Sequence, residues 1–166
     1  MADAIVTLYR GGRDAHGRSL EDMLKYDHVA LEEHHDFIQF LFPSDQPSQF
    51  QDAPLVTAKT RREFAADAAM RANLGRSLDV MLNFYGLWYD HGTGRVERGD
   101  NFAVRAKNWL AVPNHNFLRV TRILRSLALL GLPDRAAALL ACLEELYRDR
   151  AAIIGDAVRY WRNAGI

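Results

Sequence analysis

The segment NHNFLRVTRILRSLALLGL, residues 114–132, carries the clearest helical pattern in this 166-residue chain. Asn114 can accept the first free backbone N–H groups as an N-cap, and Gly131 followed by Pro133 marks the end of the helix. Between these limits, apolar residues recur every three or four positions: Phe117, Val120, Ile123, Leu124, Leu127 and Leu130. This spacing predicts an amphipathic helix whose apolar face packs into a core.

A second stripe of the same predicted helix is polar. At about 100° per residue, one side of the helix carries His115, Arg119, Arg122 and Ser126. Guanidinium groups bind carboxylates or phosphates through forked N–H donors, and a neighbouring imidazole can donate or shuttle a proton. The row is therefore a candidate anion-binding surface.

Helix signals recur on both sides of this segment. Ser19 with Asp22 predicts a short helix through Tyr26, and Asp27 can cap a longer helix that ends before Pro43. Propensity and spacing predict three further helices towards the C-terminus, at about 101–110, 134–150 and 156–164.

The middle of the chain contains a longer helical stretch. Thr60 with Glu63 resembles a capping box for a helix through about Leu74, and apolar spacing continues through RSLDVMLNFYGLWY. Gly75 lies between the two patterns, so we expect either two helices or one helix that is kinked at this glycine.

Three segments lack helical patterns. Residues 1–17 contain IVTLY and then a Gly-rich stretch, which predicts a short extended segment and a turn. Residues 43–56 hold three prolines and predict an irregular loop, and residues 91–100 begin with the turn sequence HGTG and predict an exposed loop. With seven or so helices, the chain is expected to form an all-α, irregular helical bundle, a single domain over residues 1–166.

Composition argues against several classes of partner. Lys and Arg together number 21, as do Asp and Glu, so the chain has no net charge to attract nucleic acid or an anionic membrane. Cys142 is the one cysteine, so no intrachain disulfide can form, and a reducing compartment is expected. There is neither a signal-peptide pattern nor a run of about 18 apolar residues. We therefore expect a cytoplasmic protein without membrane or nucleic-acid partners.

Longer motifs resemble the conserved region of the opioid growth factor receptor family. Residues 114–132 share its His-Asn, Leu-Arg-x-Thr-Arg-Ile-Leu and Leu-Gly-Leu elements. LEEHHDFIQFLFP, residues 31–43, resembles the family's other signature, with Phe37 and Phe40 in place of Tyr and Trp. Shorter agreements are YRG at 9–11, LED at 20–22, DAPLVT at 52–57, NFYG at 83–86 and YWR at 160–162. The short spacing between blocks resembles compact bacterial-type members.

The resemblance brings two polar rows together. Glu32, His35 and Gln39 share one stripe of the helix expected after Asp27, and all three match the family's second signature. We expect this stripe to face the polar residues of the signature helix: His115, Asn116, Arg119 and Arg122. Tyr85 in NFYG is included as an aromatic lining residue, although aromatic residues at helical spacing are commonly part of a core.

The same residues allow an internal interpretation. Glu32 could neutralise an arginine and His35 could bind a backbone group, so that the cluster fixes helix registry as a buried network. His28, Glu32 and His35 also have the spacing of a metal site with two histidines and one carboxylate. Because His28 has no counterpart in the family signature, we expect neither a metal nor a cofactor.

Three functions are compatible with these residues. The resemblance implies a non-catalytic binding domain, since animal members of the family are associated with binding the pentapeptide enkephalin. Here Arg119 and Arg122 would hold a small anionic ligand or a peptide carboxylate. An enzyme, a small hydrolase or transferase, could instead use His35 and Glu32 for acid–base chemistry beside the same arginines, although no catalytic motif is present. The third possibility is an adaptor or homo-oligomer with an exposed apolar patch, formed by Phe40, Phe42 and Phe50.

Overall fold

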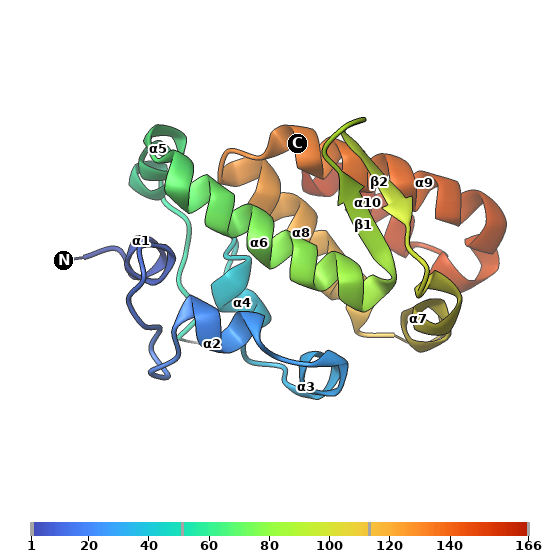
Figure 1. Ribbon diagram of the computed structural model, residues 1–166, viewed down its shortest axis with the longest axis horizontal. Helices are drawn as coiled ribbons and strands as arrows, with labels where there is room; N and C mark the ends of the chain where they lie inside the picture. Colours follow the sequence, from blue (N-terminus) through green and yellow to red (C-terminus); the bar gives the residue numbers. More distant parts are fainter. Residues whose placement is uncertain (1, 51, 113, 166) are drawn as a thin grey trace.

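The computed structural model describes residues 2–50, 52–112 and 114–165, and helices dominate these ranges (Figure 1). The helices are α1 (Ala4–Tyr9), α2 (Leu20–Leu24), α3 (His28–Glu33), α4 (Ile38–Leu41), α5 (Ala58–Ala66), α6 (Ala68–Tyr85), α7 (Phe102–Trp109), α8 (Asn116–Leu129), α9 (Pro133–Ile154) and α10 (Ala157–Ala164). One antiparallel hairpin joins β1 (Leu87–Asp90) and β2 (Arg95–Arg98). The predicted all-α class is confirmed, with ten helices in the described ranges instead of about seven.

The C-terminal half is organised around α8. This helix packs against α9 and α10. The hairpin lies between α6 and α9, since β1 contacts α6 and β2 contacts α9 (Figure 1). The predicted apolar face of α8 is buried at Val120, Ile123, Leu124 and Leu127. Burial of four large aliphatic side chains contributes several kcal/mol, roughly 1.5–3 kcal/mol each, and fixes which side of α8 faces outward.

The ends of α8 differ slightly from the expectation. The helix begins at Asn116, so its N-cap residue is His115, which makes no side-chain capping hydrogen bond, and not the expected Asn114. The Asn114 carboxamide does accept a hydrogen bond from the Asn116 backbone N–H at 2.8 Å. Gly131 has a φ of +88°, as expected of a glycine that terminates a helix. Pro133 then opens α9 directly.

The expected extended segment at the N-terminus is wrong, because residues Ala4–Tyr9 form α1. The Asp3 carboxylate caps this helix by accepting hydrogen bonds from the backbone N–H groups of Ile5 and Val6. Ile5 and Tyr9 are buried, and α1 packs against α5 and α6. Tertiary burial and a good N-cap outweigh the β-branched residues that suggested a strand.

The single long helix expected between Asp27 and Pro43 is also wrong. Two short helices, α3 and α4, occupy this stretch, and the connection leaves the helical region at His34, whose φ and ψ are −78° and 128°. The Asp27 cap itself is confirmed, since its carboxylate accepts a hydrogen bond from the Ala30 backbone N–H. The interruption arises from contacts with α8 that are described below.

The hairpin was missed because each strand has only four residues. The expected turn at residues 91–94 is confirmed, but residues 95–98 form β2 and not a loop. The register pairs Leu87 with Arg98 and Asp90 with Arg95. Val96 is the buried side chain of β2, where the hairpin packs against α9.

The middle helices are divided at Asp67 and not at Gly75. Asp67 caps α6, which then runs without a break through Gly75 to Tyr85. The capping box of α5 pairs Thr57 with Thr60, three residues before the expected position. None of the helices in the described ranges combines the length and apolar character that a membrane span requires.

Candidate ligand-binding site

The Glu32 carboxylate lies between three elements of the fold. From α3, its Oε2 accepts hydrogen bonds from Asn108 Nδ2 of α7 at 3.0 Å and from Asn116 Nδ2 of α8 at 3.2 Å. Its Oε1 lies 3.3 Å from His115 Nε2. Burial alone would raise the pKa of Glu32, but the two amide donors, with the charges of His115 and Arg119, hold this pKa below its usual value. Glu32 is therefore ionised at neutral pH, and this protonation state does not suit a general acid.

Arg119 explains why the chain leaves the helix after Glu33. From α8, its Nη1 and Nη2 donate hydrogen bonds of 2.6 Å to the backbone carbonyls of Leu31 and His34. The guanidinium also lies over the Phe37 ring, 5.3 Å from its centroid. Only 5% of Arg119 is exposed. Arg119 thus caps the C-terminus of α3 from another helix and fixes the start of the connection to α4.

Tyr85 and Asn116 complete the buried part of this cluster. The Tyr85 hydroxyl donates to Asn116 Oδ1 at 3.3 Å, and Arg119 Nη1 donates to the same oxygen at 3.3 Å. Burial raises the pKa of the Tyr85 hydroxyl far above its usual value, so it remains a neutral donor. We call this cluster the polar core network, and its members are Glu32, Tyr85, Asn108, Asn116 and Arg119.

A small pocket opens beside the polar core network, between α4 and α8. Its volume is about 190 Å³. We call it the cationic pocket, and its lining consists of His35, Ile38, Gln39, Gln49, Phe50, His115, Leu118, Arg119 and Arg122. Five of these residues were predicted as site residues: His35, Gln39, His115, Arg119 and Arg122. The described lining holds two arginines and two histidines, but no carboxylate.

Arg122 is the arginine of this pocket with the fewest partners. Its Nη1 donates one hydrogen bond, to the Phe42 backbone carbonyl at 3.3 Å, and no carboxylate of the described residues forms an ion pair with it. Partial burial lowers the pKa of the guanidinium, and no neighbouring anion opposes this effect. Arginine nevertheless stays protonated in proteins, so Arg122 keeps a positive charge that is available to a ligand.

The two histidines of the pocket face each other. The ring centroids of His35 and His115 are 5.1 Å apart, with an interplanar angle of 70°. Burial, followed by the charge of Arg119, lowers the pKa of His115, while Glu32 acts in the opposite direction. His115 is therefore mainly neutral at pH 7 and has a single N–H, which the neighbouring Glu32 carboxylate, 3.3 Å from Nε2, favours on that nitrogen.

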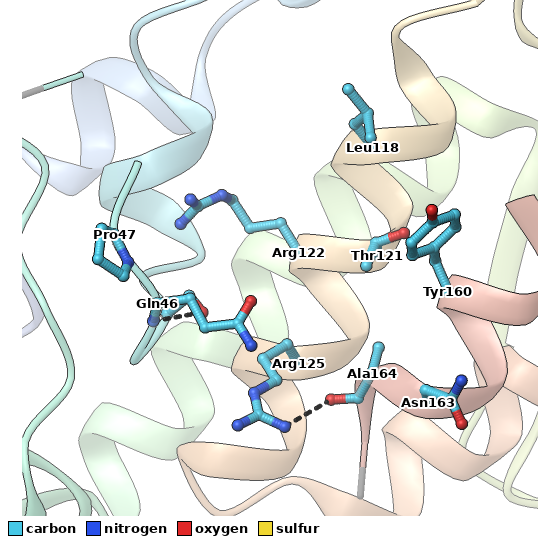
Figure 2. Close-up of a pocket in the computed structure, with 10 residues that line it drawn as sticks. Gln46, Pro47, Leu118, Thr121, Arg122, Arg125, Tyr160, Asn163 and Ala164 are labelled. Carbon is cyan, nitrogen blue, oxygen red and sulfur yellow. Dashed lines mark hydrogen bonds between the residues drawn. The ribbon is translucent and has the colours of Figure 1, made fainter. Parts of the chain in front are cut away.

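A second pocket, of about 340 Å³, lies along the outer face of α8. Figure 2 shows Arg122 reaching from α8 towards Gln46 and Pro47, while Tyr160 approaches from α10. We call this the outer pocket. It shares Leu118 and Arg122 with the cationic pocket, so the two hollows are neighbours along one helix.

The predicted residues thus fall into two groups that the sequence did not distinguish. Glu32, Tyr85 and Asn116 belong to the polar core network, whereas His35, Gln39 and Arg122 line the cationic pocket. The expected stripe of Glu32, His35 and Gln39 on one helix is wrong, because the first lies on α3, the second in the connection and the third on α4. Folding of the connection nevertheless places His35 and Gln39 in one pocket.

The structure also bears on two alternative interpretations of the sequence, a metal site that includes His28 and an exposed aromatic patch. His28 Nε2 lies 2.8 Å from Asn83 Oδ1, and across the described ranges no three His, Cys, Asp or Glu side chains are grouped as metal ligands. The exposed aromatic patch is wrong for two of its three members, since Phe40 and Phe42 are buried and Phe50 alone is partly accessible.

The sequence interpretation missed the outer pocket and Asn108. Tyr160 lies in the YWR block and Thr121 in the α8 signature, so both stood in recognised motifs without an assigned role. Asn108 carried no motif. Its contact with Glu32 spans 76 positions of the chain, and no local pattern predicts such a pairing.

Comparison with known proteins identifies the family. The profile described as the opioid growth factor receptor (OGFr) conserved region matches residues 13–164. The chain belongs to the OGFr conserved-region family. The opioid growth factor receptor of Rattus norvegicus is 42% identical over 127 residues, which cover 74% of this chain and 22% of the relative. For the receptor of Homo sapiens the identity is 39% over 129 residues, covering 74% and 19%.

A second type of relative carries the same OGFr region. Opioid growth factor receptor-like protein 1 of Mus musculus is 36% identical over 119 residues, which cover 69% of this chain and 25% of that protein. This OGFr-family chain thus spans about a fifth to a quarter of the length of these curated relatives. No solved structure matches it. The predicted family is confirmed, and the match includes all eight predicted site residues.

Proposed function

We propose that this OGFr-family domain is a non-catalytic binding module that holds a small anionic ligand, or the carboxylate of a peptide, in its cationic pocket. The observation that carries the proposal is the charge of the lining. Two arginines and two histidines meet in a hollow of about 190 Å³ whose described lining contains no carboxylate. An anion would supply the missing countercharge.

The lining residues would have different roles. Arg122 is the direct anion contact, since within the described ranges its guanidinium has a single partner, the Phe42 carbonyl. Arg119 is already held by two backbone carbonyls and would act through its charge. His35 would donate a hydrogen bond, and Glu32 would orient the His115 ring, which packs against His35. The names of the relatives describe receptors, which supports binding rather than catalysis.

Titration of small anions tests this proposal. The ligands are acetate, inorganic phosphate and a short peptide in two forms, with a free and with an amidated C-terminus. Calorimetry should detect at least one anion, and Arg122→Gln should weaken its binding roughly tenfold or more, because a charge-assisted hydrogen bond is lost.

The matched control is Arg148→Gln, which removes an exposed arginine of α9 outside both pockets. It should leave affinity unchanged. Equal losses in both variants would indicate a nonspecific charge effect, and absence of binding by every anion would contradict the proposal. Conversion of a ligand into product would contradict the non-catalytic part.

A further inference from the structure

Gln39 of α4 is a buried polar residue whose side chain has no hydrogen-bond partner among the described residues. Its side chain lines the cationic pocket, and 7% of the residue is exposed. Within the described ranges no group forms a hydrogen bond with its carboxamide, and Oε1 is fully buried and unpaired. A buried acceptor without a donor costs about 1–3 kcal/mol, so this arrangement requires an explanation.

A carboxamide presents a specific recognition pattern. It carries an acceptor oxygen and a donor nitrogen in one plane, and the group with the complementary pattern is another amide. The charge of Arg122 and the unpaired carboxamide of Gln39 line the same pocket. A ligand that satisfies both therefore contains an anionic group and, close to it, an amide.

The remaining lining limits the size of this ligand. Ile38, Phe50 and Leu118 provide apolar contacts, and a volume of about 190 Å³ is below the roughly 300–1,000 Å³ of pockets for drug-sized molecules. One amino-acid unit is in the appropriate size range. The neighbouring outer pocket, which begins at Leu118 and Arg122, gives a longer ligand a direction in which to continue.

We infer that the cationic pocket recognises an N-acylated α-amino acid carboxylate, either as a free molecule or as the C-terminal unit of a chain, with Gln39 pairing to the amide beside the carboxylate. This inference rests on the proposed function, because it assigns Arg122 to the carboxylate. It adds that Gln39 determines specificity by requiring an N–H group close to the anion. Oε1 has no accessible surface in the structure, so this pairing requires a rotation of the terminal carboxamide about its broad, roughly two-fold χ3 torsion, which turns the oxygen towards the pocket.

The test combines one ligand change with one protein change. The ligands are N-acetyl-leucine and its ester analogue 2-acetoxy-4-methylpentanoate, which replaces the amide N–H by oxygen and keeps the carboxylate. Wild-type protein should bind N-acetyl-leucine about tenfold more tightly, since the ester leaves Oε1 unpaired. In Gln39→Leu the two dissociation constants should become equal.

Arg148→Gln is again the control, because Arg148 is exposed on α9 and lies outside both pockets. It should retain the tenfold preference. Gln39→Leu is expected to fold with equal or higher stability, since it removes an unpaired buried group. If wild-type protein binds both ligands equally, the role of Gln39 is overturned while the anion proposal stands. If neither ligand binds, the inference is overturned, and the titrations with acetate and phosphate decide separately on the proposed function.

A further comparison identifies the source of the recognised unit. A tetrapeptide that ends in leucine is measured beside N-acetyl-leucine. Tighter binding of the peptide, lost in Thr121→Lys of the outer pocket, supports the terminus of a chain as the ligand. Equal affinity supports a free N-acyl amino acid. Weaker binding of the peptide overturns the assignment to a chain terminus.

Discussion

Two polar clusters lie side by side in this fold, and they differ in how completely their hydrogen bonds are satisfied. In the polar core network, Glu32, Asn116 and Arg119 each have at least two partners from other parts of the chain or from each other. In the cationic pocket, Arg122 has one carbonyl partner and the side chain of Gln39 has none among the described residues. The comparison separates groups that stabilise the fold from groups that are available to a ligand.

The same difference separates Arg119 from Arg122, which the sequence analysis treated as one anion-binding pair. Arg119 and Arg122 are three residues apart on the same helix and line the same pocket. Arg119 nevertheless holds the backbone of α3, whereas Arg122 faces a pocket whose described lining contains no carboxylate. Both are arginines on the same polar stripe of α8, so their roles are distinguished only by the groups that each of them contacts.

The largest expected effect comes from substituting these two arginines in the same way. Arg119→Met should lower the free energy of unfolding by roughly 3 kcal/mol, because it leaves the carbonyls of Leu31 and His34 buried without their charged donors. Arg122→Met should cost less than about 1 kcal/mol. Urea denaturation measures both. Equal costs for the two variants would remove the proposed distinction between network and pocket.

Substitution of Glu32 should have a smaller effect on stability, and this effect should depend on pH. The folded-state pKa of Glu32 lies below its ordinary value of 4.5, so its carboxylate stabilises the fold above about pH 4.5, and this contribution is lost as the pH falls through the lower folded-state pKa. Glu32→Gln should therefore reduce stability at pH 6 by about 1–2 kcal/mol, and this difference should shrink as the pH falls from 4.5 through the folded-state pKa. A constant difference across this range would show that the ionised state of Glu32 does not matter.

His115 provides a matched control in a different pH range. Its folded-state pKa lies below the ordinary value of 6.5, so the folded protein resists protonation of this ring. Stability should decrease as the pH falls from 6.5 through the folded-state pKa, and His115→Gln should remove this decrease. The effect of His115 should thus begin as the pH falls below 6.5, and that of Glu32 only as it falls below 4.5; a His115 effect that began only below pH 4.5 would contradict the assignment.

Local signals explain which parts of the fold could be predicted. The caps at Ser19 and Asp27, the apolar face of α8 and the glycine at 131 are encoded within a few residues, and the structure confirms each. The break after Glu33 could not be read locally, because it depends on donors from Arg119, 85 positions from His34. The hairpin was missed because four-residue strands are shorter than a reliable alternating pattern.

The candidate site shows the same limit. Residue types and family motifs selected His35, Gln39 and Arg122, and folding brings them into one pocket. The motifs did not separate them from Tyr85 and Asn116, whose hydrogen bonds lie within the protein. The two groups can be separated only when the hydrogen-bond partners of every side chain are known. A helical stripe shows which side of a helix a side chain projects from, but not which group it contacts.

The central claim is that Arg122 and Gln39 are available to a ligand while Arg119 is committed to the fold. Nitrogen-15 NMR of the side-chain N–H groups during titration with N-acetyl-leucine tests it most directly. We expect the signals of Arg122 Nε–H and Gln39 Nε2 to shift progressively and saturate, while the signals of Arg119 Nε–H and of the α9 backbone change little. Saturating shifts confined to other surfaces, or no shift of Arg122 and Gln39 at any ligand concentration, would contradict the account.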